Sequence, residues 1–122
     1  MQAILAELGI TAYYMSDVDR LGVTRVTEDI LASLDPAACR NIHLSFDIDA
    51  LDPGEAAATG TPVLGGLTLR EGLTLCTALH NTGRLMTLDL TEVNPLLGDA
   101  DEAAATVLAA NRIVWAALGL KQ

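Results

Sequence analysis

Aromatic and basic residues are both scarce in this sequence. Phenylalanine, tyrosine and tryptophan make up 3% of its 122 residues, so a core must be built mainly from Leu, Val, Ile and Ala. Seven Lys and Arg face 16 Asp and Glu, which gives a formal net charge of −9. Because an acidic surface repels phosphate backbones, nucleic acid is excluded as a partner. Metal ions or a cationic substrate remain compatible with this charge, although acidity alone commonly serves solubility.

Cysteines and long apolar runs are also few. Cys39 and Cys76 have no metal-type spacing and form no disulfide framework, which favours a reducing, cytoplasmic compartment. Cys76 lies among apolar residues, so we expect a small core hydrophobe there. The sequence starts without the basic and apolar regions of a signal peptide. No apolar run approaches the ~18 residues that span a bilayer, so we expect no membrane partner.

Hydrophobic residues are abundant: they make up 51% of the chain, and mean hydropathy is +0.37. The length suits one domain, residues 1–122. A small domain needs polar cover, so this much apolar surface indicates either contact with a partner or membership of a larger fold.

Helical and strand-like segments alternate, which predicts an α/β fold with a mostly parallel sheet flanked by helices in three layers. Thr68 and Glu71 have the spacing of a capping box at a helix start. Gly83 and Gly119 are expected to end helices. We expect helices at 2–8, 24–34, 68–82 and 101–118, the last well buried, and strands at 10–15, 42–48 and 85–90.

Asp47 and Asp49 lie at the carboxyl end of the best predicted strand, 42–48. Since side chains alternate along a strand, both carboxylates should share a face at its carboxyl end, where ligands bind in open α/β sheets. Two such charges repel unless a cation lies between them, and oxygen ligands suit Mg²⁺, Ca²⁺ or Mn²⁺. A turn capped by these residues before Asp52-Pro53 explains the pair equally well.

Three metal-dependent interpretations can be compared. A calcium loop of the EF-hand type fails, because Asp52 and Ala58 stand where it needs Gly and Glu. Phosphoaspartyl transferases also carry two Asp after a strand, but Leu51 stands where they usually have Thr or Val. A two-metal hydrolase, in which a bridging carboxylate holds both ions, is the third interpretation.

Glu92 follows the next strand and could reach the same crevice. There a carboxylate can pair with a planar cation through two parallel hydrogen bonds, although a turn or helix-capping role is the simpler interpretation. Glycines in residues 59–66 permit tight turns that suit a pocket wall. We expect His43 to be a hydrogen-bonded core residue and His80 to lie at the surface.

Four segments in order resemble the arginase/agmatinase (ureohydrolase) family. They are SFDIDALDP at 45–53, ATGTPV at 58–63, GGLTLREG at 65–72 and EVNP at 92–95. The likeness extends loosely from about residue 8 to residue 119 and corresponds to the C-terminal part of that family's domain. Agmatinases commonly carry a Glu where Val63 stands, which favours the arginase branch.

The resemblance implies a binuclear Mn²⁺ site in which Asp47 bridges the ions and Asp49 completes one ion's shell. Glu92 would bind the guanidinium of L-arginine, and Thr61 would line the pocket. The implied reaction is attack of a hydroxide on the guanidinium carbon, giving urea and ornithine.

The family's remaining metal ligands, a His and an Asp-x-His-x-Asp segment, belong to an N-terminal half that this sequence does not contain. We therefore expect a C-terminal portion of an arginase-like domain that is inactive alone. Alternatives are a fragment of agmatinase type, or a non-catalytic module that self-associates into a homo-oligomer through exposed apolar faces and strand edges.

Overall fold

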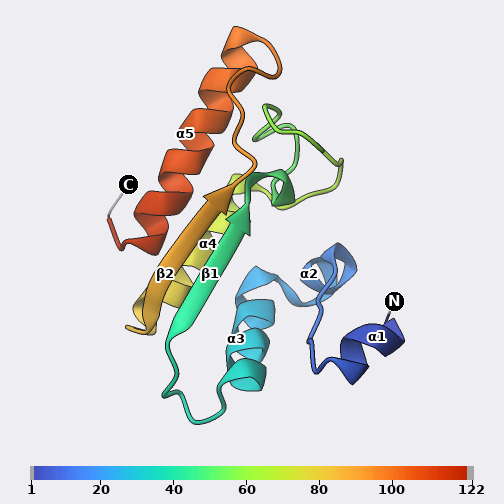
Figure 1. The fold of residues 1–122 in the computed structure, drawn as a ribbon, viewed down its shortest axis with the longest axis vertical. Helices are drawn as coiled ribbons and strands as arrows, with labels where there is room; N and C mark the ends of the chain where they lie inside the picture. The colour runs from blue at the N-terminus through green and yellow to red at the C-terminus, as the bar shows by residue number, and fades with distance from the viewer. Residues whose placement is uncertain (1, 121–122) are drawn as a thin grey trace. The chain divides into compact units, whose positions relative to one another are not determined.

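The computed structural model describes residues 2–120, which form one compact unit up to Arg40 and a second from Asn41 onward. The first unit is helical (Figure 1). Its helices are α1 (Gln2–Glu7), α2 (Met15–Leu21) and α3 (Val23–Leu34). The helix expected at 24–34 is confirmed to within one residue.

The strand predicted at 10–15 is wrong, because this segment is irregular and leads into α2. The Asp17 carboxylate accepts a hydrogen bond from the Tyr14 backbone N–H at 3.0 Å and pairs with Arg20 at 2.8 Å. Both interactions stabilise the ionised carboxylate, the Tyr14 bond most, and lower the pKa of Asp17. A local cap of this kind starts a helix where apolar alternation had suggested a strand.

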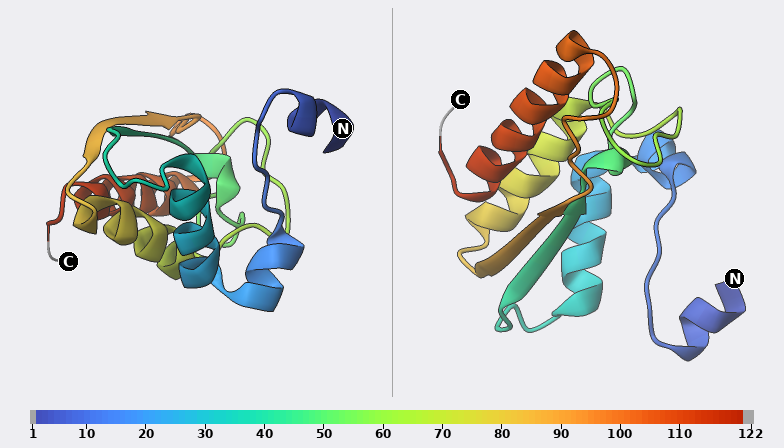
Figure 2. Two further views of the ribbon diagram at one scale, coloured as in Figure 1. Left: turned by 90° about the horizontal axis from the view of Figure 1, so that it is seen from below. Right: turned by 45° about the horizontal axis from the view of Figure 1, so that its top comes forward.

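The second unit contains a parallel pair of strands, β1 (Ile42–Asp47) and β2 (Leu85–Thr91). Helix α4 (Leu69–Asn81) lies between them in the chain, and α5 (Ala100–Ala117) follows β2. Both helices cover the same face of the sheet (Figure 2). This parallel sheet with helices packed on it confirms the predicted α/β class.

The core of this unit lies between that sheet face and the two helices. Ile48, Cys76 and Ile113 are fully buried in it, and Leu44 and Leu88 of the strands pack against it. Gly72 allows this close approach, because a Cβ there would lie only 3.0 Å from Cδ1 of Ile113. The core position expected for Cys76 is confirmed, and burial raises the pKa of its thiol to about 12.

The predicted helix boundaries in this unit are confirmed. The Thr68 backbone N–H donates to Glu71 Oε2 at 2.8 Å, and the Glu71 N–H donates to Thr68 Oγ1 at 3.2 Å. At α5 the Asp99 carboxylate accepts from the backbone N–H groups of Asp101 and Glu102. Gly83 and Gly119 follow the two helices with φ of 68° and 74°.

Two histidine predictions and one burial prediction are wrong. His43 is exposed and its ring hydrogen-bonds to Asp89 at 2.8 Å, because it alternates along β1 with Leu44, which packs against the core. His80 is half-buried and bonded to the Ala117 carbonyl, since α4 and α5 pack there. Helix α5 is buried along one side only, and Trp115 and Leu108 remain 44% and 51% exposed.

A membrane-spanning helix was not expected, and none of the helices in residues 2–120 has the length and hydropathy that spanning a bilayer requires.

Candidate functional site

The carboxyl ends of the two parallel strands lie together at one edge of the sheet (Figure 1). Asp47, the last residue of β1, is opposite Thr91, the last residue of β2. Glu92 comes directly after Thr91. Asp47 and Glu92, predicted from two separate segments, therefore lie at the same edge of the sheet.

Asp47 and Asp49 come together by a route that differs from the predicted one. The strand ends at Asp47, and residues 48–50 form a short 3₁₀ turn, η1 (Ile48–Ala50), so strand alternation does not place Asp49. Instead, the Asp49 backbone N–H donates to Asp47 Oδ1 at 3.1 Å. Ile48 between them is fully buried and fixes the turn to the core, while both carboxylates stay partly accessible.

Thr61 reaches Asp49 across twelve residues of sequence. Its hydroxyl donates to Asp49 Oδ2 at 2.6 Å. The loop between η1 and α4 brings it there. The structure thus joins three of the four predicted site residues, Asp47, Asp49 and Thr61, in one hydrogen-bonded chain.

Glu92 stands beside the same loop. Its backbone has a φ of 65°, in the left-handed region that residues other than glycine seldom adopt. A Cβ added to Gly60 would lie 3.4 Å from Glu92 Oε2, and the Asn94 N–H donates to the Ala58 carbonyl at 3.0 Å. Strained backbone that the surroundings hold in place is common at ligand sites.

Two supporting residues were missed from the sequence. The Asp52 carboxylate accepts hydrogen bonds from the backbone N–H groups of Gly54 at 2.9 Å and Gly65 at 2.8 Å. These bonds, with Gly54 the largest, lower the pKa of Asp52. Buried Thr106 of α5 accepts from the Ala58 N–H at 3.0 Å. The Asp-Pro-Gly sequence could have indicated the turn at Asp52, but only the fold brings Gly65 and Thr106 close.

The oxygen atoms of Asp47, Asp49 and Thr61 are of the type that binds manganese, but they are too few for two ions. Carboxylate oxygens and a threonine hydroxyl suit a hard divalent cation. Within residues 2–120, however, no group of three or more His, Cys, Asp or Glu is placed to hold a metal ion. Two carboxylates cannot fill the shells of two ions, so no hydrolytic step is assigned to this chain alone.

The model of the Arginase family matches residues 1–119. The chain belongs to the arginase family. An arginase of Schizosaccharomyces pombe is 52% identical over 97% of this chain and 36% of its own length. Human arginase-1 is 50% identical over 96% of this chain and 37% of its own length. The arginase structure from Bacillus caldovelox aligns with a TM-score of 0.85 at 38% identity, over 98% of this chain and 39% of that one.

These likenesses confirm the predicted family and fold. The chain spans little more than a third of the length of these arginase relatives. What it shares with them is the part that contains the Asp47–Asp49 turn, the Thr61 loop and Glu92.

Proposed function

We propose that this chain supplies part of a binuclear Mn²⁺ site that hydrolyses the guanidinium group of L-arginine to urea and ornithine. One observation carries the proposal: the Asp47–Asp49 turn is joined to Thr61 at the sheet edge where Glu92 also begins, in a chain of the arginase family. Without further ligands the chain is inactive. We expect the enzyme that contains this site to be cytoplasmic, because Cys39 and Cys76 favour a reducing compartment.

Each residue has a role that its position supports. Asp47 would be shared by the two ions and Asp49 would complete the ligand set of one. When bound, the manganese pair supplies the activated water. Glu92 accepts two parallel hydrogen bonds from the flat guanidinium, and its strained backbone aims the carboxylate. The Thr61 hydroxyl holds Asp49 in orientation.

Manganese titration of the chain, followed by water-proton relaxation, tests the metal role. We expect weak Mn²⁺ binding that Asp47→Asn/Asp49→Asn removes. Asp19→Asn/Glu28→Gln is the matched control, because it removes two exposed carboxylates elsewhere and should keep the binding. Equal affinity in the two double variants would refute the assigned ligands.

A urea assay with L-arginine and Mn²⁺ tests the expected inactivity. We expect no urea above a manganese blank from the 122-residue chain, and release of urea by this chain would overturn that expectation. In a longer chain that also carries the remaining ligands, Asp47→Asn should abolish urea release. Agmatine is the alternative substrate, and Val63 argues against it because agmatinases commonly carry a Glu there.

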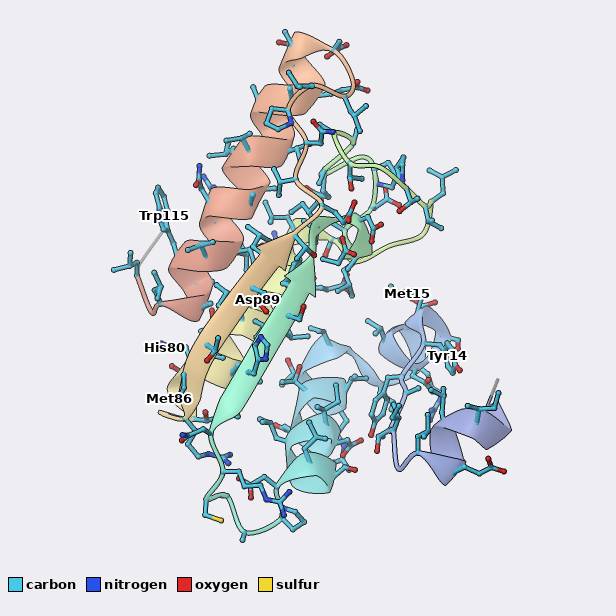
Figure 3. The ribbon with its side chains drawn as sticks, viewed as in Figure 1. Tyr14, Met15, His80, Met86, Asp89 and Trp115 are labelled. Carbon is cyan, nitrogen blue, oxygen red and sulfur yellow. The ribbon has the colours of Figure 1, made fainter. Side chains whose placement is uncertain are left out.

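A second candidate function is assembly without catalysis, as a homo-oligomer of this chain. Trp115 points away from the core in Figure 3, and with Val107 and Leu108 it leaves one side of α5 apolar and exposed. A second copy would cover this side. Light scattering across micromolar concentrations should show mass growing with concentration, and Trp115→Gln should reduce that growth. A constant monomer mass would eliminate this candidate.

A further inference from the structure

The position of Thr61 is not set by burial. Residues 60–65 of its loop are all exposed, so no packed side chain among them fixes where the Thr61 hydroxyl lies. Its 2.6 Å bond to Asp49 must therefore depend on how the loop is held on either side. Two sets of hydrogen bonds hold it.

The first set holds the loop at Ala58, which is fully buried. Its backbone N–H donates to Thr106 Oγ1 of α5, and its carbonyl accepts from the Asn94 N–H beyond β2, both at 3.0 Å. The chain before Thr61 is thus joined to two elements of the packed unit. Nothing in this set restrains the chain after Thr61.

The second set holds the chain after Thr61. The Leu67 N–H donates to the Ala50 carbonyl at 2.8 Å, and the Asp52 carboxylate adds two further bonds. Asp52 Oδ1 accepts from the Gly54 N–H and Oδ2 accepts from the Gly65 N–H, so each oxygen holds one end of the loop. The Asp52 N–H also donates to the Leu67 carbonyl at 2.8 Å. The space is tight, because a Cβ on Gly66 would lie 2.7 Å from the Asp52 nitrogen. Because the carboxylate has two acceptor oxygens, one side chain accepts from both N–H groups.

We propose that Asp52 is a positioning residue of the site. By closing the loop through Gly65, its carboxylate places the Thr61 hydroxyl on Asp49 and so orients a metal-binding carboxylate that it does not touch. The importance of this orientation rests on the proposed function, whereas the coupling from Asp52 to Thr61 does not.

The test is an NMR experiment on the metal-free chain. Asp49→Asn should shift the Thr61 amide and methyl resonances. The same substitution in an Asp52→Ala background should lose this shift, since Ala offers no acceptor and the Gly65 N–H is released. Glu55→Gln, which alters a carboxylate of the same loop outside these bonds, should keep the shift. Unchanged Gly72 resonances would show that the core remains folded.

An Asp49 effect on Thr61 that survives Asp52→Ala would overturn the proposal. A measurement on the unaltered chain covers the case in which Asp52→Ala does not fold. Gly65 is exposed, so slow hydrogen exchange of its amide requires the bond to Asp52, and free exchange would equally refute the proposal. Neither result involves manganese, so a failed manganese titration would refute the proposed function and leave this coupling standing.

Discussion

The two faces of the β1–β2 sheet differ sharply although they alternate along the same residues. Leu44 and Phe46 of β1 face the core under α4 and α5. His43 and Ser45, which alternate with them along β1, are exposed on the other face. Asp89 of β2 lies on that face too, as Figure 3 shows. Asp47 continues the second series, because it is two residues beyond Ser45.

The core and the candidate site therefore lie on opposite faces of the sheet. The covered face is apolar and holds the unit together, as expected for a sheet packed on helices. The open face is polar and ends at the carboxylates of the candidate site.

The largest expected effect is a difference in thiol reactivity. Cys76 lies in the core, where burial raises its thiol pKa to about 12, whereas Cys39 is exposed. We expect a disulfide reagent at pH 8 to modify Cys39 at once. Cys76 should react more slowly by about 4,000-fold or more, since its exposure requires unfolding at a cost of about 5 kcal/mol or more. In Cys39→Ser no fast phase should remain, and rapid labelling of Cys76 would show that the covered face opens easily.

Ile113→Ala should lower the free energy of unfolding by about 2–5 kcal/mol, because it leaves a cavity where a fully buried side chain stood. Urea denaturation measures this. Leu108→Ala on the same helix is the matched control and should change stability by no more than about 0.5 kcal/mol, since Leu108 is half exposed. Similar losses in both variants would mean that the outer side of α5 is also covered.

Neighbouring residues of β1 allow a direct comparison of the faces. Leu44→Ala removes a partly buried side chain from the core edge and should cost about 1–3 kcal/mol of unfolding free energy. Ser45→Ala on the open face should stay within about 0.5 kcal/mol. Chemical denaturation of both variants decides the matter, and a larger loss at Ser45 would contradict the assignment of faces.

The smallest expected effect concerns His43 and Asp89. Their side chains are 56% and 55% exposed, so solvent screens the pair, and its coupling should be only about 0.2–1 kcal/mol. A double-mutant cycle of His43→Ala and Asp89→Asn measures it, and added salt should reduce it further. Coupling that is large and insensitive to salt would show that water is excluded from the open face.

The elements with strong local determinants could be predicted from the sequence. The Thr68–Glu71 capping box starts α4 as expected, and the alternation of apolar residues locates β1. The strand at 10–15 could not be excluded, because the Asp17 cap that starts α2 competes with a weak apolar pattern.

The sequence predicted that Asp47, Asp49 and Thr61 belong together, but not the contacts that join them. Alternation placed Asp49 on a strand, whereas the Asp47 side chain caps a 3₁₀ turn there. The contacts of Thr61 with Asp49 and of Asp52 with Gly65 close a loop of more than ten residues. The conformational preferences of the loop residues do not predict these contacts, because the loop is also held by hydrogen bonds to Thr106 and Asn94, which are distant in sequence.

The parallel pairing of β1 with β2 also affects how the chain folds in time. Every paired position joins residues 43 or 44 apart in sequence, with α4 between them. Pairings this distant must first overcome the entropy of closing a long loop, so they form late and slowly. During synthesis β1 therefore leaves the ribosome well before its partner strand exists, and its apolar side chains stay open to other chains until β2 arrives.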